Sequence, residues 1–288
     1  YPTMPADPSL IRRLKEGVDH FSPNQRVLAR YVLANHQTVA FSTISQFAEQ
    51  AGVSEATIVR FAKVLDFSGY PAFQKEIRRL VRAELRGVER FRLGEARTNT
   101  AGTPLDLVAD KERDNLAALY ETFDARAYAK ALAMLRGAGE IVVVGARSAT
   151  PLAYQLWFAL AKLGYHATRV LAITPETYDH LSRVDKDACV VVIGYPRYLR
   201  EQVRLLDYAK SRKLATLTIT DSVFSPLQGS VSLYAPAESA SFVAFHCAPL
   251  VLINTLVHEL SVADKAKTLA ALERFDAVAE SQNYFVKD

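Results

Sequence analysis

The stretch that most constrains the fold is residues 43–65, TISQFAEQAGVSEATIVRFAKVL, in which two short helical patterns flank one glycine, Gly52. On both sides of the glycine, apolar residues recur every three or four positions, which predicts two helices that each bury one face. Ser54 stands where an N-cap hydroxyl accepts a hydrogen bond from the first turn of the second helix. The spacing therefore predicts a helix-turn-helix. Its predicted inward-facing residues are Ile44, Phe47, Ala48 and Ala51 in the first helix and Ile58, Phe61, Ala62 and Leu65 in the second.

The polar face of the second helix indicates DNA binding. In a DNA-binding helix-turn-helix, the second helix lies in the major groove, where its N-terminal residues meet base edges. An arginine on that helix can pair with guanine through two hydrogen bonds. The same pattern also fits an ordinary helical hairpin with a solvated polar face, because helix-turn-helix signatures are degenerate. The residues expected to contact DNA are Ser54, Glu55, Thr57, Arg60 and Lys63.

The distribution of charge favours the DNA-binding interpretation. Residues 1–90 contain 13 Lys and Arg against 9 Asp and Glu, whereas the rest of the chain contains 22 of each. The formal net charge of +4 therefore belongs to the segment that carries the helix-turn-helix. Phosphate contacts supply most of the sequence-independent affinity for DNA, so a basic excess in this segment is what such a domain requires.

Length and composition set the class of protein. A chain of 288 residues, 50% hydrophobic and 23% charged, is long enough for two globular domains. Cys189 and Cys247 lie far apart without metal-ligand spacing, which argues against a zinc site or a disulfide framework and favours a reducing compartment, the cytoplasm. The apolar run from Ala248 to Val257 is too short to cross a membrane. We expect no metal site, no export signal and no membrane partner.

The sequence pattern changes along the chain from all-helical to alternating strands and helices. Residues 1–86 predict a helix-turn-helix domain, residues 87–104 a polar linker, and residues 105–288 a second domain. Apolar runs without polar alternation, joined by helical stretches, are typical of a parallel sheet covered on both faces. The fold class is therefore α/β, with an all-helical N-terminal domain joined to a C-terminal domain whose parallel sheet is flanked by helices. In the N-terminal domain, helices are expected at residues 9–20 and from the start signal Ser22-Pro23 to about Asn35. Strands are expected at residues 141–145, 168–171, 189–193, 215–219 and 231–234, and two long helices at 242–260 and 262–280.

Four polar loops of the second domain are candidates for a ligand site. In an open α/β sheet, ligands bind outside the carboxyl ends of the strands, where helix N-termini and backbone amides attract anions. Polar loops also occur in any α/β fold as turns and caps, and Ser225-Pro226 by itself fits a helix cap. Convergence of four loops favours a small anionic ligand, whereas the incomplete glycine pattern at Gly145 excludes a nicotinamide cofactor. The residues expected to bind the ligand are Gly145, Arg147, Ser148, Arg197, Tyr198, Thr220, Ser222, Glu238 and Ser239.

These motifs resemble the MurR/RpiR transcriptional regulators, which join an N-terminal helix-turn-helix to a sugar isomerase (SIS) domain. The resemblance covers nearly the whole chain after about residue 8. It implies that residues 105–288 form a SIS domain that binds an effector and forms oligomers. The matching segments are SPNQRVLA at 22–29, VSEATIVRF at 53–61, Gly69-Tyr70-x-x-Phe73, Gly145-x-x-Ser148, and ITDSVFSPL at 219–227.

One loop departs from the family pattern. In sugar-phosphate binders of this fold, the second loop is usually Ser-x-Ser-Gly-x-Thr, whose hydroxyls and amides hold the phosphate. Here residues 194–199 are Gly-Tyr-Pro-Arg-Tyr-Leu, so the hydroxyls are gone and Pro196 removes a backbone donor. Two roles remain open for Arg197, a bidentate clamp on a phosphate or carboxylate and a pairing with a structural carboxylate. A sugar acid phosphate or other carboxylate therefore fits as well as an aldose phosphate.

The resemblance implies a ligand-responsive transcriptional regulator of carbohydrate or central carbon metabolism, without catalytic residues or a cofactor. Family members generally act as dimers or higher oligomers on palindromic operators, so we expect a homodimer or homotetramer on palindromic double-stranded DNA. The long helices at 242–260 and 262–280 are the expected subunit interface.

Catalysis is the main alternative, because the SIS fold also serves isomerases. Sugar isomerisation needs a base beside a carbonyl. Glu238 is the best candidate base, with His180, His246 and His258 as distant helpers. A SIS domain used only for dimerisation is a third interpretation.

Overall fold

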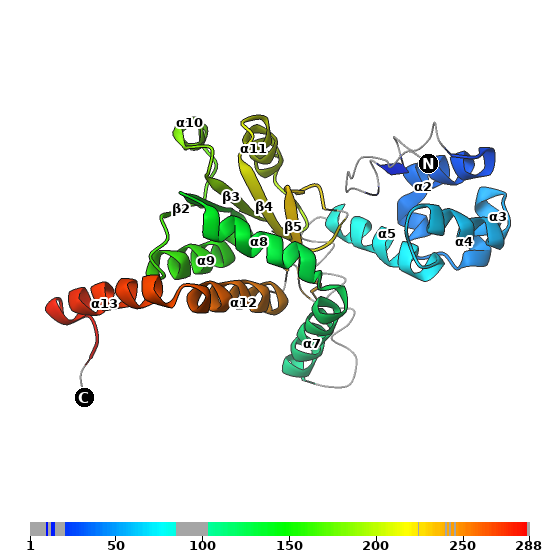
Figure 1. Cartoon of the computed structure of the whole chain (residues 1–288). Helices are drawn as coiled ribbons and strands as arrows, with labels where there is room; N and C mark the ends of the chain where they lie inside the picture. Colours follow the sequence, from blue (N-terminus) through cyan, green and yellow to red (C-terminus); the bar gives the residue numbers. More distant parts are fainter. Residues whose placement is uncertain are drawn as a thin grey trace. The chain divides into compact units, whose positions relative to one another are not determined.

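The structure, a computed structural model, describes residues 21–84, 103–223, 225–239 and 246–286, together with residues 10, 13, 14, 241, 243 and 244. The chain divides into two units, residues 1–96 and 97–288. We call them the N-terminal unit and the C-terminal unit and describe each by itself (Figure 1). The segment expected as a linker, residues 87–104, lies almost wholly outside the described residues, and the expected domain limits stay a prediction.

The N-terminal unit contains the helix-turn-helix that the sequence predicts. Its two helices end and begin within one residue of the expected positions. The first helix expected in this unit, residues 9–20, lies mostly outside the described residues. The described helices are α2 (Pro23–Val39), α3 (Ile44–Ala51), α4 (Glu55–Val64) and α5 (Tyr70–Glu84).

Helix α2 begins where the sequence predicts and continues past its expected end. The backbone N–H of Ser22 donates to Gln25 Oε1 at 3.0 Å, and Pro23 occupies the first helical position. Asn35, the expected last residue, has a φ of −130° and a ψ of 27°, so it kinks the helix. Its side-chain amide donates to the Tyr31 carbonyl oxygen at 3.1 Å, which competes with the helical hydrogen bond there. Helix α2 thus bends at Asn35 instead of ending.

Aromatic side chains fix α4 against its neighbours. Phe47, Phe61 and Phe73 are fully buried. The ring centroids of Phe61 and Phe73 lie 6.0 Å apart in an edge-to-face arrangement, and Phe47 stacks on Tyr70 at 6.0 Å. Such aromatic pairs add about 0.5–1.5 kcal/mol beyond the burial of their area. One face of α4 is therefore committed to this core and the other is left to solvent.

The C-terminal unit is an α/β domain in which the described strands form one parallel sheet with the order β2-β1-β3-β4-β5. Its strands are β1 (Ile141–Gly145), β2 (Ala167–Val170), β3 (Cys189–Ile193), β4 (Ala215–Thr220) and β5 (Val231–Tyr234). Its helices are α7 (Pro104–Thr122), α8 (Ala125–Gly137), α9 (Thr150–Lys162), α10 (Pro175–Arg183), α11 (Arg200–Ser211), α12 (Cys247–Ala263) and α13 (Lys265–Ser281).

Helices cover both faces of the sheet, so the apolar strand pattern is explained (Figure 1). Val143 and Val191 point into a core shared with α8, α9 and α12. Their neighbours Val142 and Val190 point into a second core, shared with α10 and α11. Because residues of both orientations are buried, β1 and β3 show no alternation of apolar and polar residues.

Three sequence predictions need correction in this unit. The helix expected at 242–260 begins at Cys247 and ends at Ala263, and part of its expected start lies outside the described residues. Ala244, before the helix, packs against the core from an irregular segment, so apolar composition there did not mean helix. Residues 225–230 form no helix, so Ser225 is not a helix cap.

Helix α10 was not predicted at all. Its sequence, PETYDHLSR, is mostly polar, and only Thr177 and Leu181 are buried. The preceding Thr174 and Pro175 form the usual start signal of a helix, which would have located it.

Among the described residues, no single helix is long and apolar enough to cross a membrane. Taken together, α12 and α13 pass that test by length and composition, but the pair is bent by 102°.

Candidate functional site

The turn of the helix-turn-helix is built by Gly52 and Ser54. Gly52 ends α3 with a φ of +66°, a left-handed conformation that glycine adopts with little strain. The Ser54 hydroxyl oxygen accepts from the backbone N–H of Thr57 at 3.3 Å and lies 2.8 Å from the Thr57 hydroxyl. Both hydroxyls that were expected to meet DNA therefore also hold the first turn of α4.

The outward face of α4 presents a basic surface. Glu55 is exposed, and its Oε1 accepts from the Ser45 hydroxyl of α3 at 2.5 Å, which ties the two helices together. Arg60 and Lys63 are exposed. Within the described residues neither of these two side chains forms an ion pair, so both can reach a ligand without breaking an internal contact.

The candidate ligand loops of the C-terminal unit lie at one edge of the sheet. The strand order places a topological switch point between β1 and β3, because the chain leaves β1 toward β2 on one side and continues from β3 on the other. The candidate loops follow β1, β3, β4 and β5, which are neighbours in the sheet and all parallel. All four therefore emerge at its carboxyl edge.

Gly145 is the last residue of β1 and Gly194 directly follows β3, and close packing requires glycine at both positions. A Cβ at residue 145 would lie 2.5 Å from the Ala153 Cβ and 3.0 Å from the Ala149 carbonyl oxygen. A Cβ at residue 194 would lie 2.3 Å from Leu227 Cδ1. Neither glycine has a positive φ. Glycine at residue 145 is therefore required by its contact with α9 and not by a left-handed turn.

Two arginines adopt the left-handed backbone conformation in the loops that flank the switch point. Arg147 has a φ of +55° and Arg197 a φ of +70°, and both side chains are exposed, as is the neighbouring Ser148. A non-glycine residue in this conformation carries a strain of about 1–2 kcal/mol. Neither arginine forms an ion pair with any residue that the structure describes, which leaves the structural-carboxylate role of Arg197 without a partner there.

The loop after β4 is held together by its own polar groups. The fully buried Thr220 hydroxyl lies 2.8 Å from the Ser225 hydroxyl and 3.2 Å from Asp221 Oδ1. Tyr198, from the loop after β3, donates its hydroxyl to the same carboxylate. The half-buried Ser222 accepts at its carbonyl from the Ser225 backbone N–H at 3.1 Å. Thr220 and Tyr198 therefore join two candidate loops to each other.

The loop after β5 is held by α7. The Asn115 side chain donates to the Glu238 carbonyl oxygen at 2.8 Å and accepts from the Glu238 N–H at 3.0 Å. Lys111 lies 3.0 Å from the Glu238 carboxylate. The next residue, Ser239, accepts at its hydroxyl from the Ser241 N–H at 2.8 Å. The sequence analysis missed Asn115 and Lys111, since nothing in an amphipathic helix indicates which distant loop it will contact.

The candidate bases of an isomerase are engaged elsewhere or exposed. His180 Nε2 lies 2.9 Å from Glu140 Oε1, and the Thr168 hydroxyl donates to the same oxygen at 2.8 Å. Glu140 directly precedes β1, so this group lies toward the amino end of the sheet, opposite the four loops. His258 is exposed on α12.

Two further side chains at the carboxyl edge were not predicted as ligand contacts. Tyr195 follows β3 by two residues and is 5% exposed. His246 occupies the N-cap position of α12, and its ring centroid lies 5.8 Å from that of Tyr195. Within the described residues, Tyr195 Oη and His246 Nε2 are buried polar atoms without a hydrogen-bond partner.

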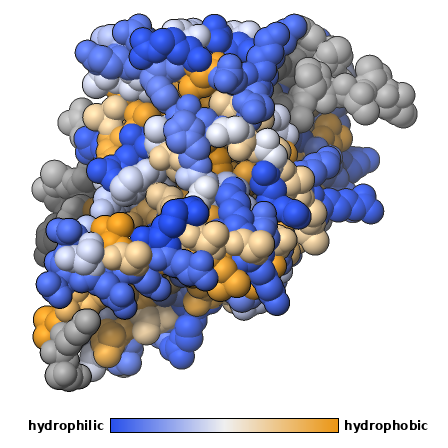
Figure 2. Space-filling view, turned by 60° about the vertical axis from the view of Figure 1, so that its left-hand side comes forward, coloured by the Kyte–Doolittle hydropathy of each residue, from blue (hydrophilic) through white to orange (hydrophobic). Residues whose placement is uncertain are grey.

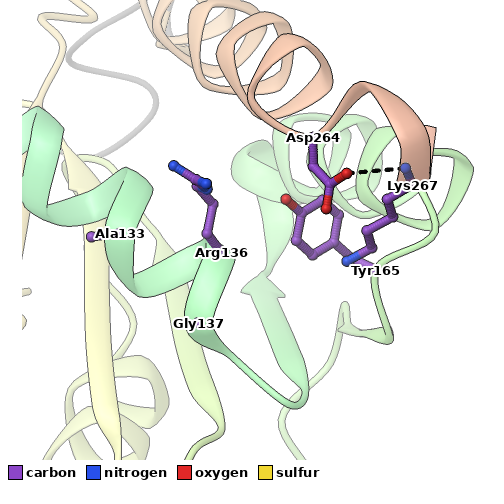
Figure 3. A pocket seen from close by; sticks show the side chains of 6 residues that line it. All are labelled: Ala133, Arg136, Gly137, Tyr165, Asp264 and Lys267. Carbon is purple, nitrogen blue, oxygen red and sulfur yellow. Dashed lines mark hydrogen bonds between the residues drawn. The ribbon is translucent and has the colours of Figure 1, made fainter. Parts of the chain in front are cut away.

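A hollow of about 390 Å³ lies at the opposite, amino edge of the sheet (Figure 3). Gly137 and Tyr165, which precede β1 and β2, help to line it. The Lys267 ammonium lies 3.6 Å from the Tyr165 ring centroid, and the Lys267 N–H donates to Asp264 Oδ1 at 3.0 Å, which caps α13. These groups serve the packing of α13, and the hollow shares no residue with the four loops.

Comparisons with known proteins agree with the two units. The family model "Helix-turn-helix domain, rpiR family" matches residues 9–82, and the model "SIS domain" matches residues 134–259. Among solved structures, the sugar isomerase domain of an RpiR transcription factor from Sphaerobacter thermophilus has a TM-score of 0.58 at 23% identity, covering 60% of this chain and 98% of that chain. The Vibrio vulnificus NanR protein, complexed with ManNAc-6P, has a TM-score of 0.57 at 20% identity over 95% of this chain and 99% of its own. At these identities the two structures establish the fold alone.

Relatives of similar length carry the same arrangement over most of the chain. The Escherichia coli HTH-type transcriptional regulator YfhH is 26% identical over 269 residues, which cover 87% of this chain and 93% of YfhH. The HTH-type transcriptional regulator HexR of the same organism is 21% identical over 281 residues, or 95% of this chain and 96% of HexR. With both family models placed in this order, the chain belongs to the RpiR family of transcriptional regulators, which combine a helix-turn-helix domain with a SIS domain.

Proposed function

We propose that this protein binds operator DNA through α4 and that a small anionic sugar derivative, bound at the carboxyl edge of the sheet, changes its affinity for that DNA. Family membership supports the regulatory role, and the NanR structure gives one relative in the fold that is described with a sugar phosphate. An effector shifts operator affinity only through its preference for one conformational state over another. The sign of the response, repression or activation, is left open.

The observation that carries the sensing proposal is the pair of arginines at the switch point. Arg147 and Arg197 stand in strained backbone conformations on the two loops where an α/β sheet binds its ligands. A glycine in either position would form the same turn with less strain. The turns themselves do not require a guanidinium group. We therefore infer that both guanidinium groups bind a phosphate or a carboxylate through two hydrogen bonds.

The other candidate residues divide between contact and support. Ser148 is exposed beside Arg147 and can donate to the same anion. Gly145 gives α9 its close approach, and Thr220, Tyr198 and Ser222 shape the loops. In the loop after β5, α7 positions Glu238, and a hydrogen bond within the loop positions Ser239. From these positions both side chains can contact the hydroxyls of a sugar.

The partners of the candidate bases favour a regulator over an isomerase. An isomerase base must reach a carbon-bound proton of the substrate. The Glu238 carboxylate pairs with Lys111, and His180 pairs with Glu140 toward the opposite edge. We therefore propose no catalytic role for these residues.

On the DNA side, we propose that Arg60 reads bases and that Lys63 contacts phosphate, while Ser54, Glu55 and Thr57 position the start of α4 at the base edges. Two copies of α4 must span half-sites about one helical turn apart, which requires a homodimer or homotetramer on a palindromic operator. As a DNA-binding protein without visible metal-ligand spacing or disulfide framework, it is expected to work in the cytoplasm.

Apolar side chains exposed on the C-terminal helices support α12 and α13 as the subunit interface. Leu250 and Val251 of α12 and Leu269 and Leu272 of α13 are each more than one third exposed. On the face of the molecule seen in Figure 2, apolar residues are interspersed with polar ones. Such a mixture does not by itself distinguish an interface from other surface, so the interface proposal rests on the exposed apolar side chains of α12 and α13.

A thermal-shift screen tests the sensing proposal. The panel contains sugar phosphates, sugar acids and phosphorylated sugar acids, and the single tryptophan, Trp157 on α9, reports unfolding of the C-terminal unit. A ligand at 100 times its Kd stabilises the native state by about 2.7 kcal/mol. We expect at least one compound to raise the midpoint of the wild type, with little effect on Arg197→Ala and a normal effect on Arg204→Ala, an exposed arginine of α11. A full shift in Arg197→Ala would remove the clamp from the proposal.

A further inference from the structure

The carboxyl edge contains a second polar feature besides the arginines, the adjacent rings of Tyr195, which is buried, and His246, which is half-buried. Tyr195 is 5% exposed and packs in the core between the sheet and α12. His246 precedes α12, and the two rings meet at 5.8 Å with an interplanar angle of 46°. The pair joins the loop after β3, on the switch point, to the segment that follows β5.

Each ring carries one buried polar atom that no described residue satisfies. These are the Tyr195 hydroxyl oxygen and His246 Nε2. Leaving a buried polar atom unpaired is unfavourable, and native proteins contain few such atoms. Other polar groups at this edge are paired: the half-buried Tyr198 with Asp221 and the buried Thr220 with Ser225. Two unpaired atoms on adjacent rings therefore mark a position that a ligand group can complete.

Burial keeps both rings neutral. It raises the pKa of Tyr195 well above its ordinary value, and the nearby Asp221 and Tyr198 raise it further. Burial also lowers the pKa of His246, against the opposing effect of Glu112. A neutral phenol and a neutral imidazole can each donate or accept a hydrogen bond. An uncharged hydroxyl, which also does both, is the group that matches them.

A charged group matches this position poorly. Neither ring supplies a positive charge, and the Asp221 carboxylate lies on the same side. Moving a phosphate or carboxylate into a buried site without a cation is strongly unfavourable. Arg147 and Arg197, by contrast, are exposed at the mouth of the same loops.

We infer that the effector is held at two separate points: its anionic group by Arg147 and Arg197, and one uncharged hydroxyl between Tyr195 Oη and His246 Nε2. The inference rests on the proposed sensing function and narrows its ligand class. The effector is a polyhydroxylated molecule with a single anionic end. The loop after β3 thus serves both points, the anionic group through Arg197 and one sugar hydroxyl through Tyr195.

The test compares Tyr195→Phe with Tyr128→Phe. Tyr128 on α8 is also a buried tyrosine whose hydroxyl lacks a partner among the described residues, but it lies outside the four loops. Isothermal titration calorimetry is carried out on the full chain with ManNAc-6P, glucose 6-phosphate, 6-phosphogluconate and inorganic phosphate. Urea unfolding without ligand, followed by Trp157 fluorescence, is the second measurement.

We expect Tyr195→Phe to bind any phosphosugar that the wild type binds about tenfold more weakly, as loss of one hydrogen bond predicts. Its affinity for inorganic phosphate should equal that of the wild type, and Tyr128→Phe should change neither. Without ligand, both variants should unfold at the wild-type urea concentration or above it, because an unpaired hydroxyl has been removed from each.

Three outcomes would overturn the inference. If the phosphosugar affinity is unchanged in Tyr195→Phe, the Tyr195 hydroxyl does not contact the effector, while the sensing proposal stays intact. A lower urea midpoint in Tyr195→Phe alone would mean that the hydroxyl has a partner in the free protein. If the wild type binds none of the phosphosugars, the sensing proposal fails and this inference fails with it.

Discussion

The two units of the chain use their polar residues in opposite ways. On α4, the long basic side chains Arg60 and Lys63 are exposed and unpaired within the described residues, while short polar groups shape the turn. At the carboxyl edge of the sheet, Tyr198 and Glu238 pair with residues of other elements. A DNA surface can therefore be assembled from one local segment, whereas the ligand site depends on contacts between segments far apart in the sequence.

Because of this difference, we expect substitutions in the two units to affect different properties of the protein. Changes on α4 should alter DNA binding with little effect on the fold, because the side chains concerned face solvent. Changes to the internally paired residues of the sheet edge should alter stability and ligand binding together, because the same contacts serve both. The predictions below test this contrast, from the largest expected effect to the smallest.

Arg60→Ala should weaken specific operator binding about 10- to 100-fold, since a base-reading arginine contributes about 1–3 kcal/mol of discrimination. Binding to random DNA should change much less. The measurement is a pair of titrations against operator and random duplexes at one salt concentration. Arg30→Ala, an exposed arginine on α2, is the matched control. An unchanged ratio of the two affinities in Arg60→Ala would exclude it from the reading surface.

Gly145→Ala should destabilise the C-terminal unit by about 1–3 kcal/mol, because the new Cβ would overlap the Ala153 Cβ and press on the Ala149 carbonyl. Urea unfolding followed by Trp157 fluorescence isolates this unit. Gly137→Ala is the control, because a Cβ there meets no atom within 4 Å. Equal midpoints for the two variants would contradict the packing argument.

Gly52→Ala should destabilise the N-terminal unit by about 1 kcal/mol. Space is available for the new Cβ, so the cost comes only from the φ of +66°. Gly69→Ala, in the same unit, has no positive φ and should be neutral or slightly stabilising. Far-UV circular dichroism follows the helices of both units, so the N-terminal unit is read from the part of the transition that Trp157 fluorescence does not share. A stable Gly52→Ala would show that the turn relaxes without the left-handed residue.

Acid should destabilise the C-terminal unit partly through His246, by less than the substitutions above. Burial lowers the pKa of His246 in the folded protein, so the unfolded chain binds its proton first. The stability that its neutral form provides is complete above about pH 6.5 and is lost as the pH falls below it. In His246→Gln, the urea midpoint should therefore depend less steeply on pH between about 6.5 and 5. His258→Gln, exposed on the same helix, should follow the wild type.

The sequence was sufficient for the elements whose signals are local. The caps at Ser22 and Ser54, the glycine at residue 52 and the buried strands β1 and β3 were located from neighbouring residues alone. The start of α12 was misplaced, because the apolar segment before it is buried without being helical. Neighbouring residues show the periodicity of a segment directly, but they indicate only indirectly whether that segment is buried.

The sequence predicted where the candidate ligand site lies, but not which of its residues hydrogen-bond to one another. Parallel strand order brings four loops to one edge, which the sequence pattern already implied. Which hydroxyl is buried, and which pairs internally, depends on distant residues. Nothing adjacent to Tyr195 indicates that His246 will lie beside it. The roles assigned to individual residues at both sites stay predictions until they are measured.

The contacts of α7 affect how ligand binding at the candidate site can be transmitted to the rest of the chain. Asn115, 2% exposed, forms hydrogen bonds with both the backbone N–H and the carbonyl oxygen of Glu238. On the same helix, Glu112 Oε1 accepts from the Cys247 N–H at 3.2 Å. An effector that displaces the loop after β5 must break these bonds or carry α7 with it. Helix α7 begins at Pro104 and is the first helix that the structure describes in the C-terminal unit. A movement of the loop after β5 would therefore be passed to the described helix of this unit that stands nearest in sequence to the N-terminal unit.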